Sequence, residues 1–478
     1  MKRAPVFRRA PSASFTGAGN RVSKGADVLS SRARGLHAHG AALITQDKST
    51  DAIPLLMEAL ALAPDEHGIR HHLALAYYNT GQMGEALHEY NEIATRFPRR
   101  SEAHTNLAGV LSALGHQTLA FTAIETALAL DPGNVSAMMN LAEILKHLGD
   151  WTGARDVYAA ALITAPDSPR IRMQYGMTMV ALGQWPEGWA EMEHRDSLVA
   201  PKVHTDTAIA PRWNGRASID GKTVMIMHEQ GLGDSIMCVR FARDLAERGA
   251  HVHLRTPAPL VGLLSQAPGV SGCTPVGSVL PPHDFHVPLM SLPHLFQLEP
   301  SHVDGESYLV PAGECPAHIA ALLPNDGVPT VALSWQGNPR HTNDRRRSID
   351  GALLAPLLEL PGVRFVAMQK IPTVQELLPV RMQQKLIDVG SACADFVESA
   401  HALRRVNLVV TVDTAVAHLA GATGAPTLVC LPFTPDYRWG LTRTTTPWYR
   451  HMRLIRQRAD ASWAAVLDEV RARVVALQ

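Results

Sequence analysis

Three short segments of the chain combine residue types that can bind anions or move protons. The first reads Gln230-Gly-Leu-Gly-Asp234 and follows a short apolar run. Glycines after a strand let the backbone approach a phosphate or a sugar at a helix amino end. The dinucleotide pattern GxGxxG needs a third glycine after Gly231 and Gly233, and Ile236 stands there instead, so that fingerprint fails. On spacing alone, Asp234 is better explained as a helix cap than as a catalytic base.

The second segment is a loop that holds four arginines. It reads Trp335-Gln-Gly-Asn338-Pro-Arg340-His-Thr-Asn-Asp-Arg345-Arg-Arg347 and also follows an apolar run. Guanidinium groups match the oxygens of a diphosphate. A solvated basic loop is the alternative. Three consecutive arginines at the carboxyl end of an expected strand favour anion binding.

The third segment, Val412-Asp-Thr-Ala-Val-Ala-His418, ends an expected strand and begins an expected helix. The helix start can hold phosphate through its N–H groups. Asp413 can equally be a simple cap, Thr414 lies beside it, and a single histidine such as His418 is more often structural than functional. The chain has no Walker phosphate loop, no DxD pair and no GxSxG elbow, which argues against those chemistries.

Alternating strand and helix patterns must position these segments. Residues 197–220 resemble a linker, and the pattern predicts a first Rossmann-like lobe at 221–313, a second at 328–458 and a helix at 459–478 that bridges the lobes. Ligands favour the carboxyl ends of the strands in such lobes. The expected strands are Thr223–Met227, His251–Leu254, Val331–Trp335, Val363–Met368, Leu386–Val389, Leu408–Val412 and Thr427–Leu431.

A period of 34 residues runs through the preceding part of the chain. It is carried by Pro64, Pro98, Pro132 and Pro166, by Gly81, Gly115, Gly149 and Gly183, and by Ala52, Ala86, Ala120 and Ala154. This is the length of a tetratricopeptide unit, a pair of helices. The register predicts tetratricopeptide repeats over 33–196. Four are complete, 33–66, 67–100, 101–134 and 135–168, and a partial unit at 169–196 carries Gly188 in place of the alanine and caps the stack.

Stacks of such repeats usually bind a peptide or a protein in their groove. Asn106 and Asn140 differ by the same 34 residues, so they could form a ladder that grips the backbone of a partner. Ordinary polarity of a helix surface is the alternative.

Composition narrows the class of protein. The 478 residues hold 44 basic and 44 acidic side chains, which gives no general attraction to nucleic acid or anionic membrane. No apolar run approaches the roughly 18 residues of a membrane span. The five cysteines (Cys238, Cys273, Cys315, Cys393 and Cys430) form no CxxC pair, so we expect no disulfide framework, no metal site and a reducing, cytoplasmic setting. Residues 1–32 are basic and are expected to be a flexible tail, with an organelle transit peptide as the alternative.

Taken together, five segments resemble those of bacterial tetratricopeptide-repeat glycosyltransferases, whose catalytic part is similar to the family 9 heptosyltransferases. They are GQWPEGWAEMEHR, HEQGLGDSIMCVRFARDLAERGA, LSWQGNPRHTNDRRRSI, TVDTAVAHLAGATGAPTLVCLPF and PDYRWGLTRTTTPWYRHMRLIRQ. The resemblance implies an α-helical repeat solenoid followed by an α/β region, with two Rossmann-like lobes in a GT-B arrangement.

The resemblance also assigns roles. Asp234 matches the general base of the family. The donor-binding residues it implies are Trp335, Asn338, Arg340, Arg345, Arg347, Asp413, Thr414 and His418. Residues near the acceptor or donor are Gln230, Gly231, Gly233, Arg438 and Trp439, and the last two have no assigned role.

The expected function is a metal-independent, inverting glycosyltransferase. It would move a sugar from a nucleotide sugar, its co-substrate, to an acceptor protein or glycan recruited by the repeats, and flagellin is a candidate acceptor. The chief alternative is a non-catalytic scaffold with a nucleotide-binding or degenerate transferase domain. An epimerase-like sugar-nucleotide enzyme is a weaker alternative, because it leaves the repeats unexplained.

Overall fold

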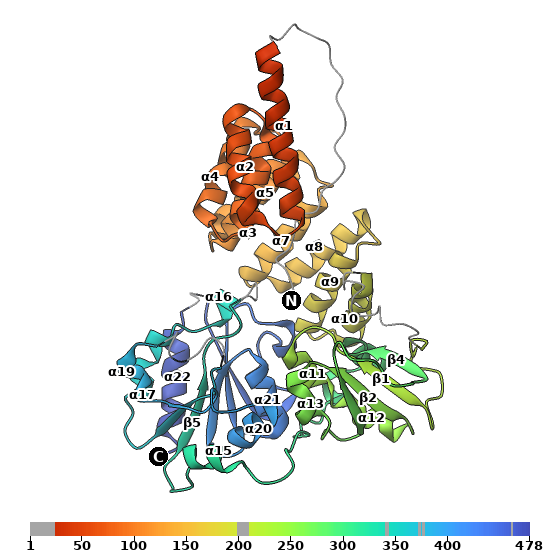
Figure 1. Ribbon diagram of the computed structural model, residues 1–478, viewed down its shortest axis with the longest axis vertical. Coiled ribbons are helices and arrows are strands. Elements are labelled where there is room, and N and C mark those ends of the chain that lie inside the picture. Colours follow the sequence, from red (N-terminus) through yellow and green to blue (C-terminus); the bar gives the residue numbers. More distant parts are fainter. Residues whose placement is uncertain (1–23, 198–209, 340–343, 371–373, 375–377, 460–461) are drawn as a thin grey trace. The chain divides into compact units, whose positions relative to one another are not determined.

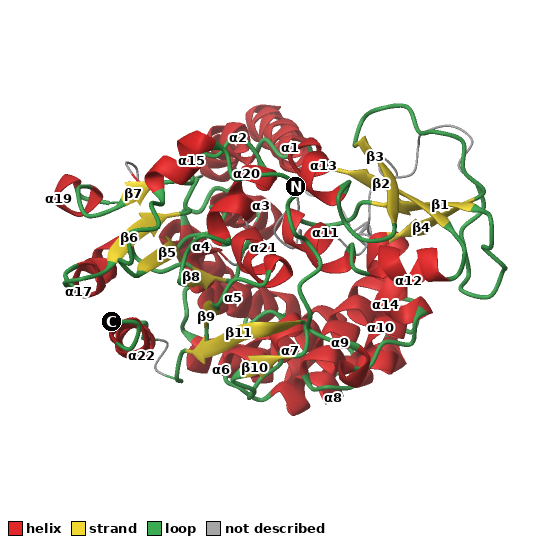
Figure 2. Ribbon diagram, turned by 90° about the horizontal axis from the view of Figure 1, so that it is seen from below, coloured by secondary structure: helices red, strands yellow, loops and turns green. Residues whose placement is uncertain are grey.

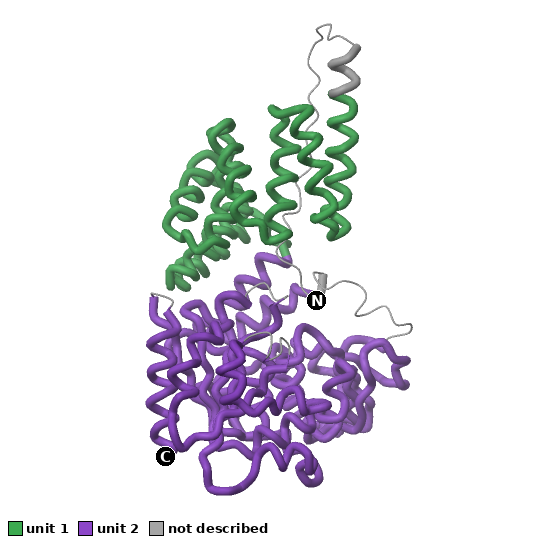
Figure 3. Tube along the Cα trace, turned by 60° about the vertical axis from the view of Figure 1, so that its left-hand side comes forward, with its two compact units in different colours: residues 1–168 green, residues 169–478 purple. Residues whose placement is uncertain are grey.

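The computed structural model describes residues 24–197, 210–339, 344–370, 374, 378–459 and 462–478 (Figure 1). The chain divides into two compact units, residues 1–168 and residues 169–478 (Figure 3). Each unit buries hydrophobic clusters of its own. All five cysteines are free.

The first unit is a stack of helix pairs. Its helices are α1 (Lys24–Thr45), α2 (Ser49–Leu62), α3 (His67–Asn79), α4 (Met83–Arg96), α5 (Ser101–Ala113), α6 (Gln117–Leu130), α7 (Val135–His147) and α8 (Trp151–Thr164). The periodic alanines of the second helices, Ala52, Ala86, Ala120 and Ala154, have no exposed surface, so their small side chains let neighbouring helices approach closely. The periodic glycines lie in the turns with φ of 80° at Gly81 and 89° at Gly149, a left-handed conformation that ends a helix.

Helix α1 begins inside the segment predicted to be a flexible tail. It starts at Lys24, whereas the sequence places the start of the first repeat at residue 33. The part of the predicted tail before Lys24 lies outside the described residues.

The partial fifth repeat belongs to the same compact unit as the α/β region. It consists of α9 (Pro169–Ala181), α10 (Trp185–Met192) and the 3₁₀ helix η1 (Glu193–Ser197). The boundary between the compact units therefore lies one repeat earlier than the domain boundary at residue 196 that the sequence suggests. The physical reason is that the tryptophans of α10 are buried against aromatic residues of the α/β region.

The first lobe contains a small parallel sheet with the strand order β3-β2-β1-β4. Its elements are β1 (Thr223–Met227), α11 (Leu232–Cys238), α12 (Phe241–Glu247), β2 (His251–Thr256), α13 (Ala258–Leu264), β3 (Val270–Pro275), β4 (Phe285–Pro288), η3 (Leu289–Ser291), α14 (Leu292–Leu295) and η4 (Pro300–His302). Strand β1 has the predicted bounds. The helical pattern after it is broken at Val239 and Arg240, where the Arg240 guanidinium donates to the Met237 carbonyl over 3.0 Å.

The segment after residue 209, predicted to be linker, packs on the first lobe. The Trp213 side chain is 1% exposed, and its backbone N–H donates to the carbonyl of His286 over 2.9 Å. The Trp213 indole N–H donates to the Ala217 carbonyl over 2.9 Å. Residues 198–209 of the predicted linker lie outside the described residues.

The second lobe contains a seven-stranded sheet with the order β10-β11-β9-β8-β5-β6-β7 (Figure 2). Its elements are α15 (Ala317–Leu322), β5 (Thr330–Ser334), α16 (Asp344–Arg347), η5 (Gly351–Leu354), α17 (Ala355–Leu358), β6 (Arg364–Ala367), α19 (Val380–Gln383), β7 (Ile387–Asp388), α20 (Phe396–Leu403), β8 (Leu408–Val412), α21 (Ala415–Thr423), β9 (Thr427–Leu431), η6 (Tyr437–Trp439), β10 (Thr445–Thr446), β11 (Tyr449–Arg456) and α22 (Ala464–Val475). All of its pairings are parallel except that of β10 with β11. Helices α17, α19 and α22 cover one face, and α20 and α21 cover the other (Figure 2).

Helix α22 belongs to the second lobe and does not bridge the two lobes as the sequence suggests. Val466, Val470 and Val474 lie in the hydrophobic cluster under the second sheet. They share it with Leu428 of β9 and Ile455 of β11, so the helical spacing of the valines serves one core only.

Both sheets reverse their strand order beside their first strand. In the first lobe the reversal lies between β1 and β4, and in the second between β5 and β8. Crevices at such points, outside the carboxyl ends of the strands, are the usual binding places in open α/β sheets. The chain is thus a tetratricopeptide solenoid followed by two parallel-sheet lobes, as the sequence predicts. The loops after β1, β5 and β8 carry the three candidate segments.

Gly188 offers a test of this packing. A Cβ added at Gly188 would lie 2.7 Å from Val180 Cγ2 and 2.8 Å from the Gly176 carbonyl oxygen. We therefore expect Gly188→Ala to lower the free energy of unfolding of the second unit by about 1–3 kcal/mol through overpacking. Chemical denaturation monitored by tryptophan fluorescence would measure the change.

The matched control is Gly84→Ala, because a Cβ added at Gly84 in α4 would meet no atom within 4 Å. Alanine is the better helix former, so this variant should be neutral or more stable by about 0.5–1 kcal/mol. Equal effects of the two substitutions would contradict the close approach of α9 and α10.

Candidate functional site

The glycine-rich loop after β1 places Asp234 in the first turn of α11. Its Oδ2 accepts a hydrogen bond of 2.6 Å from the N–H of Gly231, the residue that caps the helix. Gly231 is the N-cap and Asp234 lies three residues on, so Asp234 stabilises the start of the helix but is not itself the N-cap that its spacing suggests. Gln230 precedes the cap with a φ of 67°, an uncommon conformation for a residue with a side chain.

The other carboxylate oxygen of Asp234 pairs with Arg438 of the second lobe. The Arg438 guanidinium also donates to Asp436 over 2.7 Å and lies 4.4 Å from the centre of the Tyr437 ring. Burial would lower the pKa of Arg438, but the carboxylates of Asp234 and Asp436 outweigh burial and hold that pKa well above its ordinary value. The two lobes therefore meet at a permanent positive charge bound by two carboxylates.

His418 packs directly beside this ion pair. A Cβ added at Gly233 would lie 2.7 Å from His418 Cδ2, so only glycine fits there between the lobes. The ring of His418 stacks on Trp439 at 5.3 Å, and its Nδ1 lies 3.0 Å from the Tyr449 hydroxyl. Burial lowers the pKa of His418 to about 3, helped by the nearby positive charge of Arg438. His418 is therefore a neutral contact between the lobes.

Asp413 and Thr414 lie at the carboxyl end of β8, and it is Thr414 that caps α21. The Thr414 hydroxyl accepts the N–H of Val416 over 3.3 Å. Burial, with the negative charge of Asp436, raises the pKa of Asp413 to about 6, although Arg347 and Arg438 oppose the shift. Because Thr414 caps α21, Asp413 is not the simple cap that the sequence offered as an alternative.

Arg347 is the arginine of the basic loop that reaches this cluster. Its Nη1 donates to the Asp413 carbonyl over 2.9 Å, and its Nε donates to Asp344 over 3.3 Å. A side chain at Gly337 would collide with both Asp344 and Arg347, which explains the glycine in that turn. Arg347 is thereby held at the crevice between β5 and β8.

The remaining candidates of this loop lie elsewhere. Trp335 is 2% exposed and belongs to the core cluster under the second sheet. Asn338 and Arg345 are exposed, and Arg340 lies outside the described residues. The structure thus gathers Asp234, Gly231, Gly233, Arg347, Asp413, Thr414, His418, Arg438 and Trp439 at the junction of the lobes.

Sequence reasoning missed Asp436 and a buried ion pair between Arg195 and Glu229. Asp436 lies in the same short segment as Arg438, so that the Arg438 guanidinium binds two carboxylates, those of Asp436 and Asp234. Arg195 binds Glu229 through two hydrogen bonds of 3.1 and 2.7 Å. Asp436 lies in an aromatic segment and Glu229 in a glycine-rich one, which is the signal that could have found them, whereas Arg195 lies among other charged residues and carries no such signal.

The asparagines of the repeats bond to their own chain. The Asn140 amide donates to the Thr105 carbonyl over 3.1 Å, and the Asn106 amide lies 3.3 Å from His71 Nδ1. His37 and His72 make a similar contact at 2.7 Å between ring nitrogens. These side chains therefore brace successive repeats, which occupies part of the hydrogen-bonding capacity that a peptide ladder would use.

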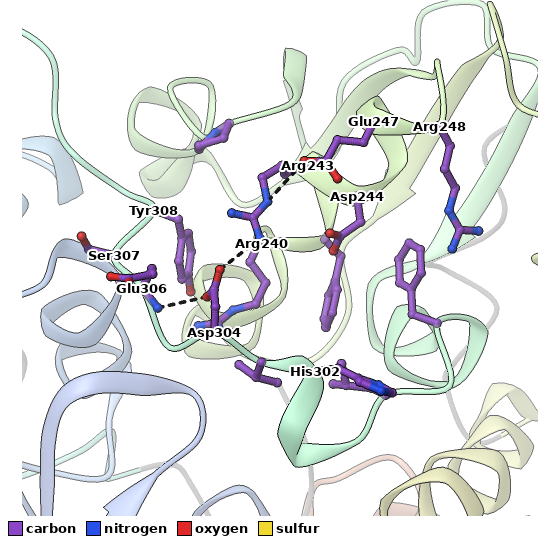
Figure 4. Close-up of a pocket in the computed structure, with 15 residues that line it drawn as sticks. Arg240, Arg243, Asp244, Glu247, Arg248, His302, Asp304, Glu306, Ser307 and Tyr308 are labelled. Atoms are coloured by element: carbon purple, nitrogen blue, oxygen red, sulfur yellow. Dashed lines mark hydrogen bonds and ion pairs between the residues drawn. The ribbon is translucent and has the colours of Figure 1, made fainter.

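A separate cavity of about 320 Å³ lies in the first lobe between α12 and the segment that leads to the second lobe (Figure 4). Its lining includes Arg240, Asp244, Phe296 and Tyr308, and none of the residues gathered around Asp234. Among the described residues, no group of three or more histidine, cysteine or acidic side chains is placed to hold a metal ion.

Comparison with known proteins identifies the repeats. The tetratricopeptide repeat family matches residues 43–116 and residues 105–169. The chain is 28% identical over 321 residues to Protein FlbA of Caulobacter vibrioides, covering 61% of this chain and 52% of FlbA. It therefore spans about half the length of the curated relative it matches.

Similar solved structures include the tetratricopeptide protein TTC0263 of Thermus thermophilus. It is 20% identical, with a TM-score of 0.33, and the match covers 36% of this chain and 92% of that one. PilF of Pseudomonas aeruginosa is 14% identical, with a TM-score of 0.34 and coverage of 47% and 88%. Residues 43–169 thus carry tetratricopeptide repeats, a type of array that mediates interactions between proteins. None of the described helices is long and apolar enough to span a membrane.

The neutral state of His418 yields a prediction about stability and pH. The pKa of His418 is about 3 in the folded chain and about 6.5 in the unfolded one. Between these values only the unfolded chain takes up the proton, so the contribution of His418 to stability is complete above pH 6.5 and is lost as the pH falls. Between pH 7.5 and pH 5, urea unfolding should show wild type losing about 2 kcal/mol more than His418→Gln.

Asp413 changes stability with pH in the opposite direction, because the pKa of Asp413 is raised to about 6 in the folded chain. Asp413 is present in both wild type and His418→Gln, so its contribution cancels when the two are compared. The control is His451→Gln at an exposed position, which should leave the pH dependence as in wild type. An identical pH dependence in wild type and His418→Gln would contradict the buried, neutral imidazole.

Proposed function

We propose that the second unit is a glycosyltransferase that uses a nucleotide-sugar donor. The observation that carries the proposal is the ion pair between Asp234, on the glycine-rich loop after β1, and Arg438 of the second lobe. Asp413 lies near Arg438, and the Arg347 guanidinium binds the Asp413 carbonyl. A carboxylate of one lobe and two guanidiniums of the other are the groups that a base and a diphosphate site require.

In the proposed reaction the nucleoside diphosphate lies at the carboxyl ends of β5 and β8. Arg347 and the N–H groups at the start of α21 would bind its phosphate oxygens. The acceptor hydroxyl oxygen forms a bond to the anomeric carbon, and the bond from that carbon to the diphosphate oxygen breaks. The diphosphate leaves with the electron pair, and Asp234 takes the proton of the hydroxyl. Attack from the opposite face inverts the anomeric centre.

Asp234 has both carboxylate oxygens engaged, by the Gly231 N–H and by Arg438. To act as a base it must release one of them. We infer that Arg438 moves from Asp234 to the donor diphosphate when the donor binds, which frees the carboxylate oxygen and adds a positive charge to the leaving group. This assigns Arg438, whose role the sequence left open, to the donor.

The repeats supply the acceptor in this proposal. A protein such as flagellin, or a glycan, would be recruited by the tetratricopeptide array and glycosylated by the lobes. The free cysteines suit a reducing compartment, and we place the reaction in the cytoplasm. No cofactor or metal is invoked.

A non-catalytic scaffold is the second candidate. It is favoured by the engagement of both Asp234 oxygens and by the position of the 320 Å³ cavity away from Asp234. In that case the lobes would be a degenerate transferase domain that neither binds a donor nor transfers a sugar.

Nucleotide release from a panel of UDP-, GDP-, ADP- and CMP-sugars tests the transferase. The full chain would be incubated with cell lysate as the source of acceptor, with and without EDTA. We expect Asp234→Asn to reduce lysate-dependent release on the order of a hundredfold or more, since a general base contributes that much. Arg347→Ala should reduce it on the order of a hundredfold through loss of charge stabilisation.

The matched control is Asp395→Asn. Asp395 also stabilises the start of a helix of the second unit, accepting the N–H groups of Val397 and Glu398 over 2.9 and 3.0 Å, but it lies in a different loop. Its substitution should leave turnover within about twofold. Unchanged release in Asp234→Asn would refute the base, and absence of both turnover and binding for every nucleotide would favour the scaffold.

A further inference from the structure

The Arg195–Glu229 ion pair is buried, with side-chain exposures of 1% and 2%. Arg195 also donates to the Ser291 hydroxyl over 2.8 Å, and the Met290 N–H donates to Glu229 over 3.0 Å. Glu229 follows β1, and Ser291 follows β4. The guanidinium of Arg195 therefore lies at the reversal of strand order in the first lobe and links the loops on both sides of it.

Helix α10, just before Arg195, makes a second set of contacts with the other lobe. Trp185 stacks on Trp448 with ring centres 5.0 Å apart, and Trp189 meets Tyr437 edge-on at 5.9 Å. The Trp448 indole N–H donates to the carbonyl of Arg438 over 3.1 Å. Trp189 and Trp448 have no exposed surface. The α10 tryptophans thus pack on the segment that carries Arg438.

Residues 185–195, which we call the bracket, therefore contact neighbours of both partners of the Asp234–Arg438 pair. On one side the bracket binds Glu229, in the same loop as Asp234. On the other it packs against Tyr437 and Trp448, which flank Arg438. Such contacts can fix the separation of two loops, and a displacement of about 1 Å can reduce a rate on the order of a hundredfold.

We propose that the bracket sets the geometry of the site: Arg195, acting through Glu229, positions Asp234, and Trp189, acting through Tyr437, positions Arg438. The proposal rests on the proposed function of that pair. The bracket then positions residues of the transferase site in addition to ending the repeat array.

The experiment uses the full chain and two conservative variants of the ion pair, Arg195→Lys and Glu229→Gln. The matched controls are Arg364→Lys and Asp326→Asn. Arg364 and Asp326 form an ion pair of 2.6 Å at the start of β6, outside the bracket and outside the two loops. All variants would be compared below their melting temperatures, by donor turnover and by amide hydrogen exchange.

If the bracket positions Asp234, Arg195→Lys and Glu229→Gln lower kcat about tenfold or more and leave the donor KM within about twofold, because the donor binds mainly to the second lobe. Peptides covering 228–234 should exchange faster while those of the second-lobe core stay unchanged. The controls should change neither quantity. A loss of thermal stability with unchanged kcat and unchanged exchange at 228–234 would overturn the proposal, since the ion pair would then serve folding alone.

Trp189→Phe supplies a variant that keeps the buried ring and the fold. The proposal predicts faster exchange in 436–440 and not in 228–234, the reverse of the Arg195 variant. The same pattern in both variants would overturn the division of roles. If wild type turns over no donor, the proposed function fails, and the exchange patterns alone decide whether the bracket positions the two loops.

Discussion

The ion pair between Asp234 and Arg438 is the contact on which the arrangement of the two lobes depends. A buried guanidinium must have anionic partners, and Arg438 finds one in its own lobe, Asp436, and one in the other. That need draws the glycine-rich loop after β1 to the carboxyl ends of the second sheet. The small residue Gly233 and the neutral ring of His418 then fit together beside it. The Asp234–Arg438 ion pair and the close fit of Gly233 against His418 thus favour the same contact between the lobes.

The same principle extends to the partial repeat. Arg195 is fully buried, and it is held by Glu229, Glu193 and Ser291. The aromatic side chains of α10 contribute apolar area to the second lobe, while Arg195 contributes specific hydrogen bonds to the first. A segment with the period of a repeat therefore serves as part of the α/β unit. Its glycines at 176 and 188 reflect the close helix crossing that this position requires.

Local patterns predicted most of the fold but little of the geometry of the site. The 34-residue period, strand β1 and strands β5 to β9 follow from spacing and hydrophobicity, which act over a few residues, whereas β10 and β11 of the second sheet were not predicted. The hydrogen bond from the Gly231 N–H to Asp234 is local as well. The other partner of Asp234, Arg438, is 204 positions away, and such a pair arises only from packing of the lobes. Trp335 shows that a residue of a candidate binding motif can instead belong to the hydrophobic core. The asparagines of the repeats form hydrogen bonds within their own array.

Binding of nucleoside diphosphates to Asp234→Asn tests most directly whether Arg438 alternates between Asp234 and the donor. Isothermal titration with UDP, GDP and ADP would compare wild type, Asp234→Asn and Arg438→Gln. Neutralising Asp234 releases Arg438, so the account predicts that one nucleotide binds about tenfold more tightly to Asp234→Asn and about tenfold more weakly to Arg438→Gln. Affinity unchanged or weakened in Asp234→Asn, with no loss in Arg438→Gln, would contradict it.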